Sequence, residues 1–159
     1  MRNRHPLVAL AVTAASWAIV PTGFAAPFTW SGAGGDADWT TAANWGGTAP
    51  NPADTVDVLN FPNAPASFAN TMNAAWTIAA LNVTNGSDTY ATDLGGNTLT
   101  VSGTTTVNGP DGDLADITFS NGTYKPTTLR IAYGNNGVGN GRVTVTGTFD
   151  STNLGSVSV

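Results

Sequence analysis

Residues 117–122 read ITFSNG, in which apolar and polar side chains alternate and an Asn-Gly pair follows. Alternation with a period of two is typical of a half-buried β-strand, and Asn-Gly indicates the turn that ends it. Variants of this phrase recur at LNVTNG (81–86), LTVSG (99–103), LRIAYG (129–134) and VTVTG (143–147), and Val157 begins another. The starts at Leu81, Leu99 and Ile117 are eighteen residues apart, and Val143 follows after twenty-six.

This recurrence decides the predicted fold. Self-similarity at roughly 20 residues is typical of solenoid proteins, because a single short strand cannot bury its apolar face alone. Stacked at about 4.8 Å, such strands place their Leu, Val, Ile and Phe side chains in a continuous interior column. Outward Thr and Asn side chains then form ladders on the solvent side. We expect an all-β, right-handed parallel β-helix of roughly four to six rungs.

An antiparallel β-sandwich is the alternative fold. Asn-Gly is a strong signal for a β-hairpin, and it occurs at five places (Asn85, Asn108, Asn121, Asn136 and Asn140). Sandwiches also turn at regular short intervals, so the even spacing does not separate the two folds. The return of one phrase favours the parallel β-helix.

The first 25 residues read as a secretory signal peptide. Arg2 and Arg4 precede an apolar run over residues 7–20, and Gly23-Phe24-Ala25 offers small residues at a cleavage site. The apolar run is too short for a membrane span. We therefore expect a secreted protein, extracellular or at the cell surface, whose mature chain begins near Ala26.

Beyond the signal peptide the chain is acidic. Ten Asp face only Lys125, Arg130 and Arg142, and the segment holds no His, Cys or Glu. This balance argues against nucleic acid and anionic membranes as partners. It also excludes a Ser-His-Asp triad, a Cys nucleophile and a His- or Cys-built zinc site. The sequence nominates no catalytic residue and no cofactor.

Three tryptophans (Trp30, Trp39 and Trp45) lie in a segment rich in Gly, Ala, Asn and Asp. As structure, their rings would form an apolar lid on the open N-terminal end of the β-helix. As a binding surface, Trp39 and Trp45 could stack on sugar rings, which would make the protein a carbohydrate-binding module. We expect residues 26–75 to form a Trp/Pro-rich cap with the first rung, and residues 76–159 to form the further rungs. Trp76, which alternates with Ile78, is expected in the core.

The opening of the mature segment resembles a known family. Trp30, Trp39, Ala43-Asn44-Trp45, Pro50, Asp54 and Phe61 are similar to the start of autotransporter-associated β-strand repeat proteins and their PEP-CTERM-bearing relatives. The stretch 129–147 is similar to the rungs of those proteins. The resemblance implies a large secreted bacterial β-helix, structural or adhesive and without a defined enzymatic activity. Extracellular polysaccharide and other surface proteins are the partners it implies.

This chain differs from the family in being short. It stops within an apparent strand at Val159, which predicts a fragment, a truncated product, or a unit that stacks end to end on a partner. An uncovered last rung would present an open sheet edge. Because β-helices also host polysaccharide lyases, a lyase fragment is a further alternative.

Calcium is the one metal that the sequence allows. Asp111, Asp113 and Asp116 occur at D-x-D-x-x-D spacing on a Gly-containing turn, and carboxylates are the oxygen ligands that calcium prefers. A solvated turn, in which Asp side chains bind nearby backbone N–H groups, is the simpler interpretation. Asp54 lies near a turn, and Asp57 alternates with Val56 and Val58 and therefore should point outward, so we expect both at the solvated surface.

Overall fold

The computed structural model describes residues 27–55, 57–86, 88–110, 113–131 and 140–159. The predicted signal peptide lies outside these residues. The described chain contains β-strands and one short 3₁₀ helix, η1 (Ala42–Trp45), and no α-helix. Within this described part, no helix is long and apolar enough to cross a lipid bilayer.

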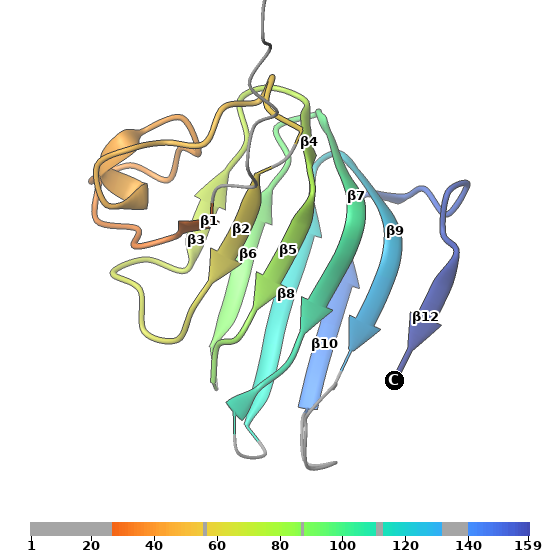
Figure 1. Ribbon diagram of the computed structural model, residues 1–159. Helices are drawn as coiled ribbons and strands as arrows, with labels where there is room; N and C mark the ends of the chain where they lie inside the picture. Colours follow the sequence, from red (N-terminus) through yellow and green to blue (C-terminus); the bar gives the residue numbers. More distant parts are fainter. Residues whose placement is uncertain (1–26, 56, 87, 111–112, 132–139) are drawn as a thin grey trace, which may run out of the picture.

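The strands build two parallel sheets, drawn one behind the other in Figure 1. Sheet A runs in the order β1-β2-β5-β7-β9-β11, with β4 also paired to β7 and β12 to β9. Its strands are β1 (Pro27–Thr29), β2 (Val58–Phe61), β4 (Trp76–Ile78), β5 (Ala80–Val83), β7 (Thr98–Val107), β9 (Thr123–Ile131), β11 (Thr148–Phe149) and β12 (Ser156–Ser158).

Sheet B runs in the order β10-β8-β6-β3. Its strands are β3 (Ala69–Thr71), β6 (Thr89–Asp93), β8 (Leu114–Ser120) and β10 (Asn140–Val145). Every pairing between these named strands is parallel. The fold is therefore a parallel β-solenoid of about four turns, and the antiparallel sandwich is excluded.

The length of one coil differs from the spacing read in the sequence. Residues in register along sheet A, from Leu59 through Leu81, Thr105 and Leu129 to Val157, advance by 22, 24, 24 and 28 residues. Leu99 and Ile117 lie at other points around the coil, in sheets A and B. The equal steps of eighteen thus join positions that never stack. The step of twenty-six from Ile117 to Val143 does stack, because both residues occupy the same column of sheet B.

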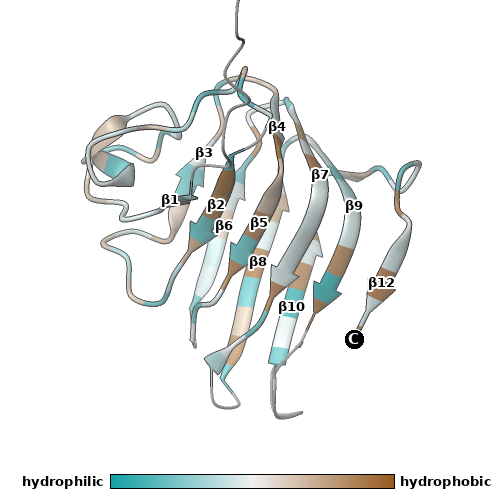
Figure 2. Ribbon diagram, viewed as in Figure 1, coloured by the Kyte–Doolittle hydropathy of each residue, from teal (hydrophilic) through white to brown (hydrophobic). Residues whose placement is uncertain are grey.

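The core lies between the two sheets and follows the period-two pattern of the strands. Apolar positions alternate with polar or neutral ones along β8, β9, β10 and β12 in Figure 2. One interior column contains Trp76, Leu99, Tyr124 and Phe149, all in register across sheet A. Trp76 is buried, as its alternation with Ile78 predicts.

Outward side chains form the expected ladders. Asn60 and Asn82 are in register, and the amide nitrogen of Asn82 donates to the Oδ1 atom of Asn60 at 2.9 Å. The interior also holds a polar pair, in which the Tyr124 hydroxyl donates to Thr105 Oγ1 at 2.7 Å. Burial raises the pKa of Tyr124, so this hydroxyl stays protonated.

Candidate functional site

The three N-terminal tryptophans form a lid over the first coil, and η1, which ends at Trp45, lies on the left in Figure 1. Their rings pack edge to face, with centroids 5.1 Å apart for Trp30 and Trp45 and 6.0 Å apart for Trp39 and Trp45. Trp39 reaches Trp76 in the core at 5.4 Å. Such edge-to-face pairs add to the stabilisation from burying the rings. The aromatic N-terminal cap predicted from the sequence is confirmed.

Each indole N–H of the lid has an acceptor. Trp30 donates to the carbonyl of Ser67 at 2.7 Å, and Trp45 donates to the carbonyl of Trp39 at 2.7 Å. Trp39 donates to the Oδ1 atom of Asn70 at 2.8 Å. Burial of these rings therefore leaves no unpaired indole N–H within the lid.

The polar residues of the lid segment, which runs from residue 30 to residue 45, surround Asn44, which is fully buried. Its Oδ1 atom accepts from the Gly34 amide at 2.7 Å, and its Nδ2 atom donates to Asp36 and to the Asp38 carbonyl. A Cβ on Gly34 would lie 2.6 Å from Asn44 Oδ1, so only glycine fits there. The hydrogen bonds hold the loop in a single conformation, which lets a Gly- and Asp-rich segment carry three tryptophans.

A sugar platform needs an exposed ring face, and the lid does not offer one. Trp39 is 0% exposed and Trp45 is 6% exposed. Both rings contact other aromatic rings on the interior side. The structure places Trp39 and Trp45 together, but as packed interior groups.

Two of the three predicted calcium ligands, Asp113 and Asp116, belong to the described residues. Asp111 lies outside the described residues. Asp116 is 2% exposed, and its Oδ2 atom accepts from the Arg142 guanidinium and from Thr89 Oγ1. The hydrogen bond from Arg142 lowers the pKa of Asp116. Among the described residues, no three acidic, His or Cys side chains lie close enough to hold a metal ion.

Asp57 is buried, which corrects the expectation that it faces solvent. It is 2% exposed, and its carboxylate accepts from the Asn51 amide at 3.3 Å. Burial raises its pKa, and the nearby Asp54 carboxylate acts in the same direction. Asp57 has the same parity as Leu59 and Phe61, the buried residues of β2, whereas the expectation placed Val58 inward. Asp54 itself is exposed, as expected.

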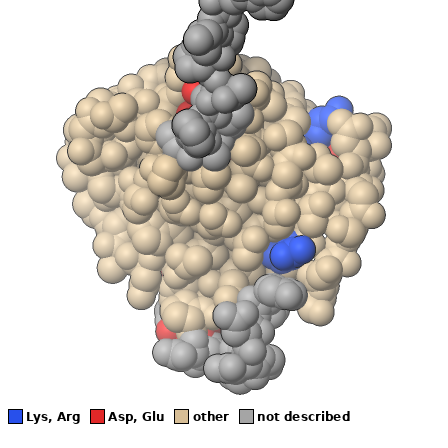
Figure 3. All heavy atoms as spheres, viewed as in Figure 1, with Lys and Arg blue, Asp and Glu red and all other residues tan. Residues whose placement is uncertain are grey.

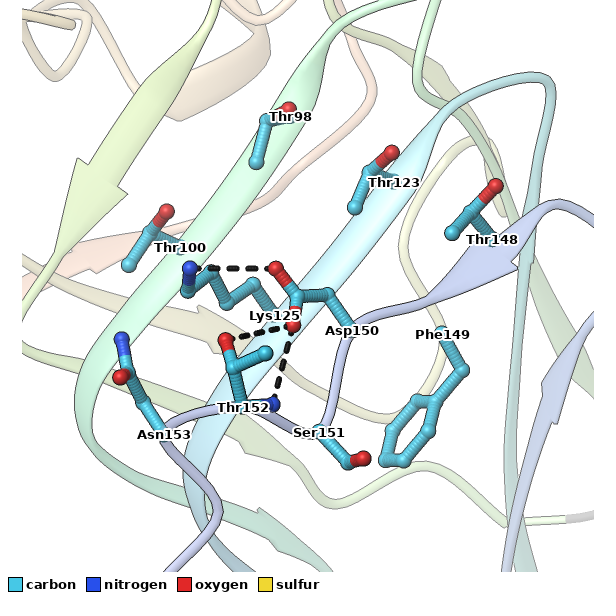
Figure 4. Close-up of a pocket in the computed structure, with 10 residues that line it drawn as sticks. All are labelled: Thr98, Thr100, Thr123, Lys125, Thr148, Phe149, Asp150, Ser151, Thr152 and Asn153. Carbon is cyan, nitrogen blue, oxygen red and sulfur yellow. Dashed lines mark hydrogen bonds and ion pairs between the residues drawn. The ribbon is translucent and has the colours of Figure 1, made fainter.

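An open hollow lies on the outer face of sheet A. Figure 4 shows its floor, where Thr98, Thr123 and Thr148 follow one another across β7, β9 and β11. Lys125 and Asp150 lie beside that column, and Lys125 Nζ is 3.1 Å from Asp150 Oδ2. We call this hollow the threonine groove.

The second carboxylate oxygen of Asp150 also has hydrogen-bond partners. Its Oδ1 atom accepts from the hydroxyl of Thr152 at 2.7 Å and from the Thr152 amide at 2.9 Å. These hydrogen bonds, and then Lys125, lower the pKa of Asp150 to about 2. The carboxylate is therefore an ionised acceptor across the physiological range.

The threonine groove was not predicted from the sequence, although a signal for it exists. Thr98-Leu99-Thr100, Thr123-Tyr124-Lys125 and Thr148-Phe149-Asp150 are spaced by twenty-five residues, and each places Thr outward and an apolar residue inward. This spacing equals one coil, so the three outward threonines stack.

The C-terminal end of the described solenoid is open, at the right of Figure 1. Phe149 is 42% exposed and Val157 is 52% exposed, although both belong to interior columns. Strand β10 is the last strand of sheet B, with Val143 and Val145 only partly buried. At the N-terminal end, by contrast, backbone hydrogen bonds from residues 37–39 cover the edge of β3.

Charged groups are sparse on the surface. Figure 3 shows a few basic and acidic atoms scattered among uncharged ones on the face in view. No family model, curated protein or solved structure matches this chain. The β-solenoid fold agrees with what the sequence resemblance implies, and the comparisons add no family to it.

Proposed function

We propose that this protein is a non-catalytic structural or adhesive segment of a bacterial surface or matrix protein. The observation that carries the proposal is the contrast between the two solenoid ends, one closed by the lid and one open. One closed end and one open end suit a unit that associates with a partner through its open end only. The resemblance of residues 30–61 to autotransporter-associated β-strand repeat proteins points the same way.

The open end is the assembly surface in this proposal, and its occupant is a second copy of this chain. Strands β10, β11 and β12 lie at the end of their sheets among the described residues, and an edge strand can pair with a strand of another chain. The half-exposed Phe149 and Val157 continue interior columns, so a partner with the same coil outline covers them. The lid blocks head-to-tail stacking. Two copies therefore meet open end to open end about a twofold axis.

Sedimentation of the chain over a range of concentrations tests this assembly. We expect a dimer that dissociates on dilution, and we expect Val157→Lys to weaken the association by roughly tenfold or more, because a buried ammonium would lie at the joint. Thr118→Lys, on the outer face of β8, is the matched control and should leave the dimer intact. A chain that remains a monomer at every concentration contradicts the assembly. So does a dimer that Val157→Lys leaves unchanged while its thermal melting shows a folded protein.

The proposed export of the protein from the cell is tested separately. Expression of the full chain in a bacterial host should release a product whose first residue is Ala26, as N-terminal sequencing of the exported protein would establish. Retention of residues 1–25 on a cytoplasmic product would contradict export. Release of unsaturated uronates from pectin would contradict the non-catalytic part of the proposal.

A further inference from the structure

The threonine groove is built by the register of three successive coils. Thr98 pairs with Thr123, and Thr123 pairs with Thr148, so their side chains stand in one outward column. Neighbouring strands in a sheet are about 4.8 Å apart. The column therefore presents hydroxyl groups at a regular step along the solenoid axis.

The side of the groove is rigid before any ligand arrives. Residues 150–155 turn back onto sheet A, where the Gly155 amide donates to the Thr127 carbonyl at 2.8 Å. Asp150 is fixed by Thr152 and Lys125, and the side chains of Lys125 and Asp150 are each 26% exposed. A preformed polar site avoids part of the entropy cost of ordering side chains on binding.

The chemistry of the groove suits hydroxyl groups. Threonine hydroxyls donate and accept, Lys125 donates, and Asp150 accepts, so adjacent ligand hydroxyls find partners of both kinds. The ammonium of Lys125 is already paired with Asp150, and the chain has a net charge of −5. An anionic ligand would have to break that pair and approach an acidic protein. The ligand that fits is neutral and rich in hydroxyl groups.

The spacing of the threonine column limits the ligand further. The regular step of the threonine column is close to the length of one pyranose unit in an extended, β-linked glycan. The Phe149 ring points away from the threonine column, as Figure 4 shows, so the column itself offers hydrogen bonds.

We infer that the threonine groove binds a neutral, extended β-linked oligosaccharide along the solenoid axis, across β7, β9 and β11. This inference rests on the adhesive part of the proposed function and names the ligand of that surface. It assigns sugar binding to outward Thr, Lys and Asp side chains, and none to the tryptophans of the lid.

Nuclear magnetic resonance titration with cellohexaose tests the inference, with maltohexaose and an oligogalacturonate as comparison ligands. Cellohexaose should shift the resonances of Thr98, Thr123 and Thr148 and leave those of sheet B in place. Thr123→Val, which keeps the shape of the side chain and removes the hydroxyl, should weaken binding about fivefold. Thr118→Val on the outer face of sheet B is the matched control and should bind as the parent chain does.

Three results would overturn the inference. One is an absence of shifts with cellohexaose in a chain that remains folded. Another is equal binding by the parent and Thr123→Val. The third is a preference for maltohexaose or oligogalacturonate over cellohexaose. Sedimentation of Thr123→Val distinguishes the two proposals, because a failure of sugar binding with an intact dimer leaves the assembly proposal standing.

Discussion

The two ends of this solenoid differ in how far they shield the apolar interior from solvent. At the N-terminal end, Trp30, Trp39 and Trp45 cover the first coil, and residues 37–39 cover the edge of β3. At the C-terminal end, the columns that contain Phe149 and Val157 reach solvent. The repeating strand pattern thus supplies an interior but no closure. Closure requires a separate, non-repeating segment with large rings and its own polar framework.

The largest effect should come from opening the closed end. Trp39→Ala removes a fully buried ring that contacts Trp45 and Trp76. It also leaves the Asn70 Oδ1 atom without its donor. We expect a loss of about 3–5 kcal/mol in the free energy of unfolding, measured by urea denaturation. A loss below about 1 kcal/mol would mean that the lid is dispensable for the coils beneath it.

The second-largest loss of stability should come from removing the hydrogen bonds that Asn44 makes within the lid segment. Asn44→Ala removes four hydrogen bonds between the Asn44 side chain and residues 34–38, and it leaves part-buried backbone groups without these partners. The expected cost is about 2–3 kcal/mol in the same denaturation experiment. Asn153→Ala, at an exposed position of the opposite end, is the control and should change stability by less than about 0.5 kcal/mol. Equal effects from both substitutions would remove the contrast between the ends.

The strands and their interior faces could be predicted from sequence because a period of two is a local signal. Phrases such as ITFSNG contain the alternation, the turn and the apolar face within six residues. The length of the coil could not be read so directly. Turns between sheets A and B vary in length, so residues in register advance by 22 to 31 positions. An even step of eighteen arose between residues that do not stack.

The sites depend on that register, which explains what the sequence left undecided. The threonine groove exists only because residues twenty-five apart stack, and each threonine alone looks like any outward strand residue. The run TVDVLNF allows two phases of alternation, one with Val58 inward and one with Asp57, Leu59 and Phe61 inward, and the structure has the second. The lid was predictable because large rings in a polar segment need a packing partner. Its hydrogen bonds through Asn44 were not, since they join residues that no periodicity relates.

A smaller effect should come from the buried carboxylate where the lid segment meets the first coil. Burial raises the pKa of Asp57, so the folded protein holds this proton more tightly than the unfolded chain does. Its contribution to stability is complete below the ordinary carboxyl pKa of about 4 and is lost as pH rises through the higher folded value. Asp57→Asn does not titrate and can still accept from Asn51. We expect the variant to be more stable near neutral pH by about 1 kcal/mol or less.

Thermal melting across a pH series provides the measurement for Asp57→Asn. The advantage of the variant should shrink as the solution becomes acidic, because both side chains are then uncharged in the folded state. An advantage that stays constant with pH would assign the effect to packing and not to the buried charge. Asp150, whose pKa is lowered to about 2, contributes in the opposite sense, since its stabilisation is lost only as pH falls toward that value.

The smallest effect on folding should come from the open end. Phe149→Ala truncates a ring that is 42% exposed and contacts Tyr124 at a centroid distance of 6.1 Å. We expect a cost of about 1 kcal/mol or less for the monomer, well below that of Trp39→Ala, because half of the ring is already in water. In concentrated solution the difference should grow, since association would bury the ring in the parent chain only. Urea denaturation of the parent chain and of Phe149→Ala over a dilution series measures this difference in stability. If Phe149→Ala and Trp39→Ala lose equal stability in dilute solution, the two ends are equally closed. A second copy would then have no exposed apolar surface to cover.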